Sequence, residues 1–488
     1  MNDNLLKKTL GLKIIAEKVA RRIQTKVPAY QHFLENHGVK IGESFANLPP
    51  TDKKSYILAY PYEELLGDDS KQILAIFRSS GSSGNPFFWP YLKSSNRFAA
   101  LGTRIFLEKS FAIHQKKTIA IVGLGLGSWL PGEHFSWGLK TMSLQLNYPF
   151  WVVTPGNNLQ EIIEIIHKIK NFVEQIILLI VPSAIAHLHL KANELQQPLP
   201  LDKLKYVVLS EPFPENTRTC LQKQAGIAED IPLMFSMYGS TDTGGLGVES
   251  LATIALRKLL VQNQILAQQL GIDLPIPLFF HFVAPNTFLE TVDSSLCITK
   301  WQGIPLVRYL IYDKVAFYSW RKLKQTILNS KDLMSQDEIF LKIIKSASNW
   351  LPNLIAVSGR SDSCLVLGGT NLSEYILDEA VKAEELQKIL TGIYRASLVY
   401  KEERQFLEFD LELRPDVEDN EEMRDRVYHS LIQSIGRLEP FFLSDWQNIY
   451  RRWDNYPNQR ILRLNFQAYP ILSQTTETFI KQRGIVQS

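Results

Sequence analysis

The segment from Phe77 to Pro86 has the residue types best suited to holding an anion. It reads Phe-Arg-Ser-Ser-Gly-Ser-Ser-Gly-Asn-Pro. Glycines adopt the positive φ angles that turn backbone N–H groups toward an anion, and serine hydroxyls add further donors. No Lys-Ser/Thr pair follows the second glycine, so the segment is not a Walker loop. On its own it fits either a phosphate-binding loop or a flexible Gly/Ser turn.

A second segment, from Met237 to Asp242, reads Met-Tyr-Gly-Ser-Thr-Asp and follows a predicted buried strand at 233–235. It supplies an aromatic ring for stacking, hydroxyl donors for a phosphate and a carboxylate that can bind a metal ion. Ligands of open α/β sheets bind beyond the carboxyl ends of strands, where this segment would lie. An ordinary turn has a similar composition, so the segment alone leaves both interpretations open.

Two further segments carry single charged residues of interest. Asp313 ends an apolar run that begins at Ile304, and a carboxylate in that position can accept two hydrogen bonds from a ribose diol. It fits the cap of a turn equally well. Arg360 lies in Ser-Gly-Arg-Ser-Asp, residues 358–362, which taken alone is typical of a linker with a surface charge.

These segments need a scaffold, and residues 118–313 show the pattern of alternating strands and helices that would provide one. Strands are predicted at 118–122, 176–181 and 206–209, with an amphipathic helix at 158–172. Strands separated by helices imply βαβ units and a largely parallel sheet. The sequence therefore predicts an α/β fold here.

Both ends of the chain are predicted to differ from this pattern. Leu5 to Arg22 fits a basic amphipathic helix that lies on a membrane surface or, as we expect, packs on the body of the protein. Near Ser361 a strand, a Gly-Gly turn and a helix are followed by an alternating strand at 406–413 and a charged helix at 420–438. This predicts a small α+β domain of about 130 residues, a common domain size. We expect two domains, residues 1–359 and 360–488.

The bulk composition is that of an ordinary globular protein. The 488 residues are 45% hydrophobic and 21% charged, with a formal net charge of +3. Because Lys and Arg are mixed with acids, no nucleic-acid partner is expected. Cys220, Cys297 and Cys364 lie far apart, which argues against a zinc site or a disulfide framework and fits a reducing cytoplasm. No signal peptide and no integral membrane segment are predicted.

Taken together and in this order, the four segments resemble the adenylate-forming (ANL) superfamily, and most of all its phenylacetate–coenzyme A ligase-like branch. The branch's Ser-Ser-Gly-Thr-Thr-Gly-Lys-Pro loop is similar to Ser79–Pro86, and its Tyr-Gly-x-Ser/Thr-Glu to Tyr238–Asp242. Its Pro-Leu-Ile-Arg-Tyr-Arg-x-Gly-Asp is similar to Pro305–Asp313, and its Gly-Arg-x-Asp to Gly359–Asp362. The resemblance covers the chain from about Tyr30 to Leu438.

The sequence departs from these motifs at several positions. Asn85 stands where the loop has lysine, and Asp242 is one methylene shorter than the usual Glu. The residues 310–312, Leu-Ile-Tyr, replace Arg-x-Gly before Asp313. Lys481 stands where the family's C-terminal lysine belongs but lacks the preceding glycine, so a catalytic and a surface role are both open.

The resemblance implies a large N-terminal α/β domain of adenylate-forming type and a small mobile α+β C-terminal domain, hinged near Asp362. It implies an enzyme that uses ATP and Mg²⁺ to activate a small carboxylic acid as its acyl-adenylate, then forms a thioester with coenzyme A. One alternative acceptor is the phosphopantetheine of an acyl carrier protein, and another is an amine. A catalytically degenerate nucleotide-binding relative is the remaining alternative.

Carried over residue by residue, the resemblance assigns roles within the site. Tyr238 would stack on adenine, Asp313 would bind the ribose, and Arg360 would contact ribose or phosphate. Thr241 would bind the α-phosphate and Asp242 would hold Mg²⁺. The residues expected to hold the β- and γ-phosphates are Ser79, Ser80, Gly81, Ser82, Ser83 and Gly84. Those expected to bind the nucleotide beside the adenine are Glu211, Pro212 and Gly239.

The acid pocket is expected between residues 123–135, 209–213 and 235–245. No carboxylate stands out there to meet an ammonium group, which favours an aryl or aliphatic acid over an amino acid. His134 fits a packed or capping histidine as well as a residue of the pocket. The candidate lining residues are Trp129, His134, Phe135, Phe213 and Phe235.

Overall fold

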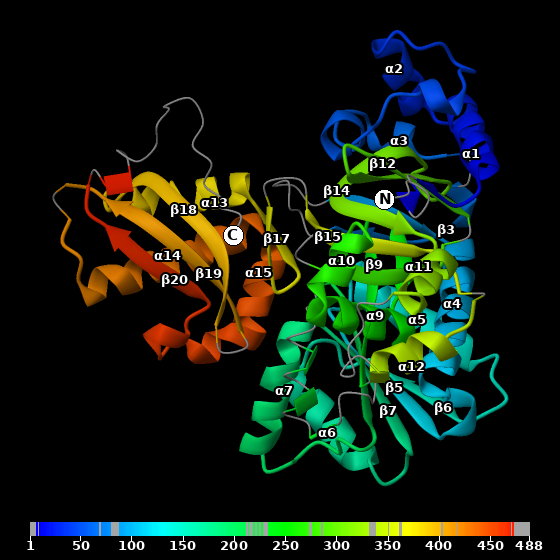
Figure 1. Cartoon of the computed structure of the whole chain (residues 1–488). Coiled ribbons are helices and arrows are strands. Elements are labelled where there is room, and N and C mark those ends of the chain that lie inside the picture. The colour runs from blue at the N-terminus through cyan, green and yellow to red at the C-terminus, as the bar shows by residue number, and fades with distance from the viewer. Residues whose placement is uncertain are drawn as a thin grey trace.

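The structure is a computed structural model of the whole chain, shown in Figure 1. It describes residues 6–472, apart from 8, 68–69, 80–86, 211–212, 214–217, 220–221, 224–225, 228–232, 273–275, 285, 331–337, 350, 361–363, 402–403, 416 and 470.

Thirteen strands of the described chain form one large sheet. Twelve of them follow the order β2-β12-β13-β14-β15-β11-β10-β9-β8-β7-β5-β6, and β1 pairs with β14. Their bounds are β1 (Leu6–Lys7), β2 (Thr9–Leu10), β5 (Thr118–Gly123), β6 (Phe150–Val153), β7 (Gln175–Ile180), β8 (Leu204–Val208), β9 (Met234–Ser240), β10 (Gly244–Val248), β11 (Leu278–Phe282), β12 (Thr287–Val292), β13 (Ser295–Lys300), β14 (Leu306–Tyr318) and β15 (Leu354–Arg360).

The sheet has a parallel half and an antiparallel half, and β9 lies where they meet. Strands β6, β5, β7, β8 and β9 pair in parallel, whereas β9 pairs with β10 in the antiparallel sense. Every residue of β5 and β7 is buried, as expected for strands covered on both faces. The predicted α/β fold is therefore confirmed, but the expected largely parallel sheet is found only in the half from β6 to β9, because the remaining strands pair in the antiparallel sense.

Helices pack on this sheet and a separate hairpin stands beside it. Figure 1 shows α4 and α5 near β5 and β6, with α6 and α7 around the parallel half. The hairpin is formed by β3 (Ile73–Arg78) and β4 (Phe88–Leu92). The helices of this part of the chain are α1 (Lys13–Lys26), α2 (Pro28–Asn36), α3 (Tyr62–Leu65), α4 (Lys93–Phe111), α5 (Leu130–Ser143), α6 (Leu159–Ile169), α7 (Pro182–Glu194), α9 (Leu251–Gln262), α10 (Gln264–Gln269), α11 (Trp320–Leu328) and α12 (Glu338–Ser346).

The N-terminal segment differs from its prediction. The expected single helix over Leu5 to Arg22 is replaced by two short strands, β1 and β2, and the helix α1 begins only at Lys13. Gly11 separates strand from helix with φ +90°, and a Cβ added there would lie 2.5 Å from the backbone oxygen of Thr287. The backbone needs glycine at the point where the chain leaves the sheet. Its positive φ angle at Gly11 is incompatible with one continuous helix.

The C-terminal part forms its own small α+β unit. A hairpin of β16 (Cys364–Leu367) and β17 (Thr370–Ser373) accompanies a sheet in which β18 (Leu390–Lys401) and β20 (Leu462–Gln467) flank β19 (Arg404–Leu413). Helices α13 (Glu374–Val381), α14 (Glu421–Leu438) and α15 (Pro440–Asp445) pack around it. Asn420 caps α14 by accepting a hydrogen bond from the N–H of Met423, as its residue type favours.

The two parts of the molecule touch through an aromatic contact. The ring of Phe441, at the start of α15, lies 5.0 Å from that of Trp129, at the start of α5. The backbone of Arg360 still belongs to the large sheet, because it pairs with Asp313 of β14. Among the described helices, none has both the length and the apolar character needed to cross a bilayer.

Candidate functional site

A large cavity opens at the carboxyl end of β9. It encloses about 2460 Å³ and is lined by residues of β4, α5, β9–β11, β13, β14 and the C-terminal unit. This position is the point where the sheet changes from parallel to antiparallel pairing, the usual place for a ligand in an open α/β sheet. The volume exceeds that of a pocket for one small molecule, so the cavity can hold more than one ligand.

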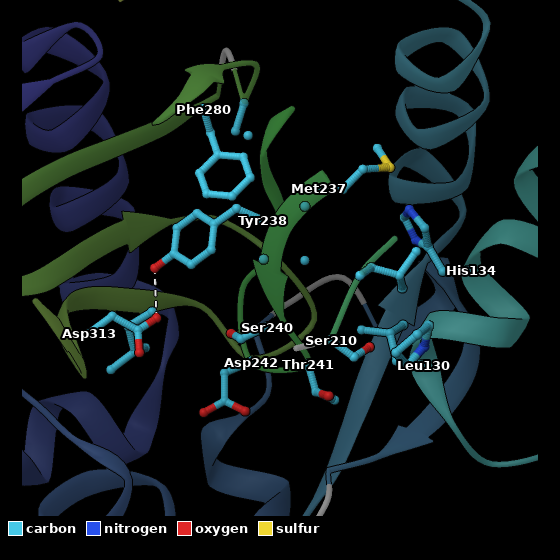
Figure 2. Close-up of a pocket in the computed structure, with 18 of the residues that line it drawn as sticks. Leu130, His134, Ser210, Met237, Tyr238, Ser240, Thr241, Asp242, Phe280 and Asp313 are labelled. Carbon is cyan, nitrogen blue, oxygen red and sulfur yellow. Dashed lines mark hydrogen bonds between the residues drawn. The ribbon is translucent and has the colours of Figure 1, made fainter. Parts of the chain in front are cut away.

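One side of the cavity, here called the β9 wall, consists of Tyr238, Thr241, Asp242, Phe280 and Asp313. Figure 2 shows these side chains gathered around the end of β9. The hydroxyl of Tyr238 donates a 2.7 Å hydrogen bond to Oδ2 of Asp313, although the two residues are 75 positions apart. The Tyr238 ring also stacks on Phe280, with centroids 5.4 Å apart and planes inclined by 25°. The ring is therefore held by a hydrogen bond at its tip and a packed partner on one face.

Asp242 is positioned by the hairpin of β13 and β14. The hydroxyl of Tyr309 donates a 2.7 Å hydrogen bond to Oδ2 of Asp242, and the side chain of Gln302 donates to its backbone oxygen at 2.6 Å. Burial and then the charge of Asp242 raise the pKa of Tyr309, so this phenol remains a donor. In the described part of the chain no cluster of three or more His, Cys, Asp or Glu side chains could hold a metal ion. Any Mg²⁺ at Asp242 would need phosphate oxygens and water to complete its six ligands.

Two backbone positions explain parts of the motifs. A Cβ at Gly239 would lie 2.4 Å from the backbone oxygen of Gly244, so β9 and β10 approach closely only because residue 239 is glycine. Tyr312, where the resembled motif has glycine, adopts φ +61°. That angle costs on the order of 1–3 kcal/mol for a residue other than glycine. The Tyr312 hydroxyl donates to Oδ2 of Asp52 at 2.5 Å, and this bond helps to offset the strain.

The base of the Gly/Ser loop lies at the edge of the same cavity. Ser79 is buried, its N–H donates to the oxygen of Phe87 at 2.8 Å, and its Oγ accepts from the N–H of Phe87 at 3.0 Å. Two hydrogen bonds thus join Ser79 and Phe87, the described residues on either side of positions 80–86. Nζ of Lys53 lies 3.4 Å from Oγ of Ser79. The guanidinium of Arg78 lies 5.0 Å from the centre of the Trp129 ring.

A second group of residues that line the cavity, here called the α5 wall, consists of Tyr91, His134, Phe135 and Lys300, and Lys300 joins this group to the turn after β9. Nδ1 of His134 lies 2.9 Å from the hydroxyl of Tyr91, and its ring packs edge-to-face on Phe135. Burial, with a smaller contribution from the charge of Lys300, lowers the pKa of His134 to about 4. The imidazole is therefore neutral near pH 7 and offers hydrogen bonding without charge.

Lys300, the last residue of β13, places a positively charged ammonium on the α5 wall. Its Nζ donates a 2.7 Å hydrogen bond to the backbone oxygen of Thr243. Burial lowers the pKa of Lys300 to about 8. The sequence had not indicated an ammonium in this pocket.

A buried carboxyl of the C-terminal unit faces the loop base. Glu439 is fully buried, and its Oε1 accepts a hydrogen bond from the N–H of Phe441 at 3.3 Å. Burial raises the pKa of Glu439 to about 8, while the charges of Arg78 and Lys53 act in the opposite direction. This carboxyl therefore lies near the charges of Arg78 and Lys53, beside the expected phosphate site.

The structure brings most of the described candidate residues into one place. Trp129, His134 and Phe135 line the cavity as expected. Phe213 and Phe235 do not line it, and the expectation for these two is corrected. Phe213 is fully buried against the guanidinium of Arg218, and Phe235 packs in the core against two other phenylalanine rings, those of Phe106 and Phe111.

Several candidate residues lie outside the described part of the chain, and for Arg360 only the backbone is described. The candidates outside are Ser80, Gly81, Ser82, Ser83, Gly84, Glu211, Pro212, Asp362 and Lys481.

Several residues of the site were missed from the sequence, among them Phe280, Tyr309, Tyr91, Lys53 and Lys300. Phe280 lies in an apolar strand and Tyr309 inside a recognised motif, so a pattern of types gives no reason to single them out. Lys53 lies outside the four segments that carried the resemblance. Lys300 is a single lysine at the end of a strand, and only the fold brings it to the cavity.

Comparisons with known proteins bear on the fold. No family model matches the sequence, and no curated protein matches it. The structure is similar to that of 2-hydroxyisobutyryl-CoA ligase in complex with 2-HIB-AMP and CoA in the thioesterification state. The TM-score is 0.57 at 12% identity, over 97% of this chain and 89% of that one. The likeness confirms the expected fold, that of adenylate-forming ligases, and at this identity it shows the fold alone.

Two weaker likenesses carry no argument, because their TM-scores are below 0.5. An open conformation of the same ligase gives 0.44 at 11% identity, over 98% of this chain and 91% of that one. The o-succinylbenzoate CoA synthetase of Bacillus subtilis, bound with a product analogue, gives 0.37 at 13% identity, over 86% and 73%.

Proposed function

We propose that this chain, which has the fold of adenylate-forming ligases, uses ATP and Mg²⁺ to convert a carboxylic acid into its acyl-adenylate and then forms a thioester with coenzyme A. One observation carries the proposal. At the end of β9, Tyr238 and Asp313 form a hydrogen-bonded pair in the same cavity as Asp242 and the α5 wall. The β9 wall is suited to a nucleotide and the α5 wall to an organic group. A cavity with these two walls fits a reaction between ATP and an acid.

The β9 wall supplies the contacts expected for the nucleoside. Phe280 covers one face of the Tyr238 ring, and adenine stacks on the ring from the side open to the cavity. Asp313 accepts hydrogen bonds from the ribose, and Tyr238 holds this carboxylate in position. Thr241, at the tip of the turn between β9 and β10, donates to the α-phosphate.

The phosphates lie toward the loop base in this proposal. Lys53 and Arg78 bring two positive charges to that end of the cavity, where Asn85 does not supply the lysine of the resembled motif. Mg²⁺ held by Asp242 would neutralise charge on the phosphate oxygens. Lys481, Arg360 and the hinge near Asp362 remain proposals from the sequence resemblance, with the domain boundary at residues 359–360.

The reaction then needs little from the protein beyond positioning and neutralisation of charge. A carboxylate oxygen of the acid attacks the α-phosphorus, the bond to the bridging oxygen breaks, and pyrophosphate leaves. In the second step the thiol sulfur attacks the acyl carbon, AMP leaves, and the thiol gives up its proton. Lys481 would stabilise the first transition state, a type of contact commonly worth about 3–4 kcal/mol.

Pyrophosphate exchange into ATP tests the proposal directly. The purified chain is assayed with aromatic, fatty, dicarboxylic and amino acids, with and without Mg²⁺, and acid-dependent exchange is the expected result. Thioester formation is then compared with coenzyme A, pantetheine-loaded carrier protein and simple amines as acceptors. Nucleotide binding without exchange for any acid would contradict the proposal and point to a degenerate relative. Exchange without thioester formation from coenzyme A would support the adenylation step and reject coenzyme A as the acceptor.

A further inference from the structure

Lys300 has an unusual setting for a charged residue. Its Nζ donates to one acceptor, the backbone oxygen of Thr243, at 2.7 Å. In the part of the chain that the structure describes, no carboxylate lies within ion-pairing distance of this ammonium. An ammonium carries three N–H donors, so two of them are left for groups in the cavity that Lys300 lines. Burial of a charge without a counter-ion is costly, and it lowers the pKa of Lys300 to about 8.

The surroundings of Lys300 leave room for a ligand. A Cβ built on Gly244 would lie 3.6 Å from Nζ, so glycine at this position keeps the space beside the ammonium open. His134 is close enough for the charge of Lys300 to lower its pKa, and its ring is neutral. The hydroxyl of Tyr91 forms a hydrogen bond with Nδ1 of His134. Of the groups that the structure describes around the ammonium, none is a negative partner.

We propose that the acid activated by this chain is dicarboxylic: one carboxylate reacts with ATP, and the other pairs with Lys300. The inference rests on the proposed function and names the substrate class for the same cavity. The distal carboxylate would supply the counter-ion that the protein lacks, and it would accept the two remaining N–H groups. A carboxylate paired with an ammonium in a water-poor site forms a short, charge-assisted hydrogen bond.

The position of Lys300 limits the length of that acid. Thr241, expected at the α-phosphate, and Thr243, which holds Lys300, are two residues apart in the turn between β9 and β10. Two residues span at most on the order of 7 Å. The reacting and distal carboxylates are therefore close together, and a short-chain diacid of roughly four to seven carbons fits better than a long one.

The test compares matched straight-chain acids in full-length protein. Succinate, glutarate, adipate and pimelate are each paired with the monoacid of equal length, from butyrate to heptanoate. Binding is measured by calorimetry in the presence of AMP, and kcat/KM by pyrophosphate exchange. We expect wild type to prefer at least one diacid over its matched monoacid by ten- to a hundredfold.

Variants then separate substrate recognition from support of the loop. Lys300→Met should abolish the diacid preference while leaving monoacid binding and the KM for ATP within twofold. Lys300→Arg should restore most of the preference. Lys109→Met removes an exposed lysine on α4 that also lines the cavity, and it should change nothing. If Lys300→Met does not fold, Lys300→Gln keeps a donor to Thr243 without the charge and should give the same loss.

Two results would overturn the inference. One is a wild type that prefers no diacid in either assay. The other is a Lys300 variant that weakens diacid, monoacid and ATP alike, which would mean that Lys300 only anchors the turn. Because binding is measured without turnover, selective diacid binding with no exchange would reject the proposed function and leave the assignment of the ligand intact.

Discussion

The β9 wall and the α5 wall face the same cavity, yet their polar groups are satisfied in different ways. On the β9 wall, side chains bond to side chains, because Tyr238 donates to Asp313 and Asp242 accepts from Tyr309. On the α5 wall Tyr91 also bonds to His134, but Lys300 bonds to a backbone oxygen and has no anionic partner among the residues that the structure describes. One wall is organised within the protein, while the other is left incomplete for its ligand.

This difference explains which parts of the site can be recognised from sequence. The residues proposed to bind ATP lie mostly in segments that resemble family motifs. The residues of the α5 wall come from positions outside those segments. We therefore expect changes on the β9 wall to affect ATP and Mg²⁺, and changes on the α5 wall to affect the acid.

The largest expected effect is that of Asp313→Ala on the use of ATP. Loss of hydrogen bonds to a charged acceptor costs about 1.5–3 kcal/mol, which lowers kcat/KM for ATP roughly ten- to a hundredfold. The KM for the acid should stay within twofold, as steady-state kinetics at saturating ATP will show. Asp313→Asn, which keeps one acceptor oxygen for Tyr238, should lose less. An unchanged kcat/KM for ATP would show that Asp313 does not bind the ribose.

Asp242→Asn should change the requirement for Mg²⁺. The amide keeps a ligand oxygen but loses the charge, and we expect the half-saturating Mg²⁺ concentration to rise about tenfold, equivalent to about 1.4 kcal/mol. At saturating Mg²⁺ the KM for the acid should match wild type. A Mg²⁺ titration that overlays the wild-type curve would make Asp242 a structural partner of Tyr309 instead.

On the α5 wall, His134→Gln should raise the KM for the acid about two- to tenfold, the range for one neutral hydrogen bond, and leave the KM for ATP unchanged. A KM for ATP that rises in parallel would erase the distinction between the walls.

The same variant should change the pH dependence of stability. The folded pKa of His134, about 4, lies below the ordinary 6.5, so the neutral ring stabilises the fold above pH 6.5 and this contribution is lost as pH falls toward 4. Lys300 and Tyr91 face this ring. Thermal unfolding from pH 7 to pH 4 should therefore be less acid-sensitive in the variant than in wild type.

The smallest effect concerns a buried carboxyl of the C-terminal unit. Burial raises the pKa of Glu439 to about 8, although the charges of Arg78 and Lys53, which face this carboxyl, act in the opposite direction. The folded protein therefore loses stability as pH rises from the ordinary range near 4.5 to about 8, and changes little above that. Glu439→Gln should make the thermal unfolding of the full-length protein less dependent on pH over this range. The same pH dependence in the variant and in wild type would assign it to another group.

The sequence predicted the architecture better than the acid pocket. The strands at 118–122, 176–181 and 206–209 lie within two residues of β5, β7 and β8, because buried parallel strands are continuous apolar runs. The pocket was misjudged at Phe213 and Phe235, since closeness to a motif in sequence does not say which face of a strand a ring occupies. Tyr312 could not be anticipated either, because its left-handed backbone depends on a hydrogen bond to Asp52, 260 residues away.

The contact of Phe441 with Trp129 makes the arrangement of the two domains sensitive to temperature. The two rings lie 5.0 Å apart, one from each domain. Apolar contacts weaken on cooling, because the free energy of hydrating apolar surface is largely entropic near room temperature. Cooling should therefore favour separated domains while each domain remains folded. Any step that needs the arrangement seen here will then slow on cooling more steeply than its chemistry alone requires.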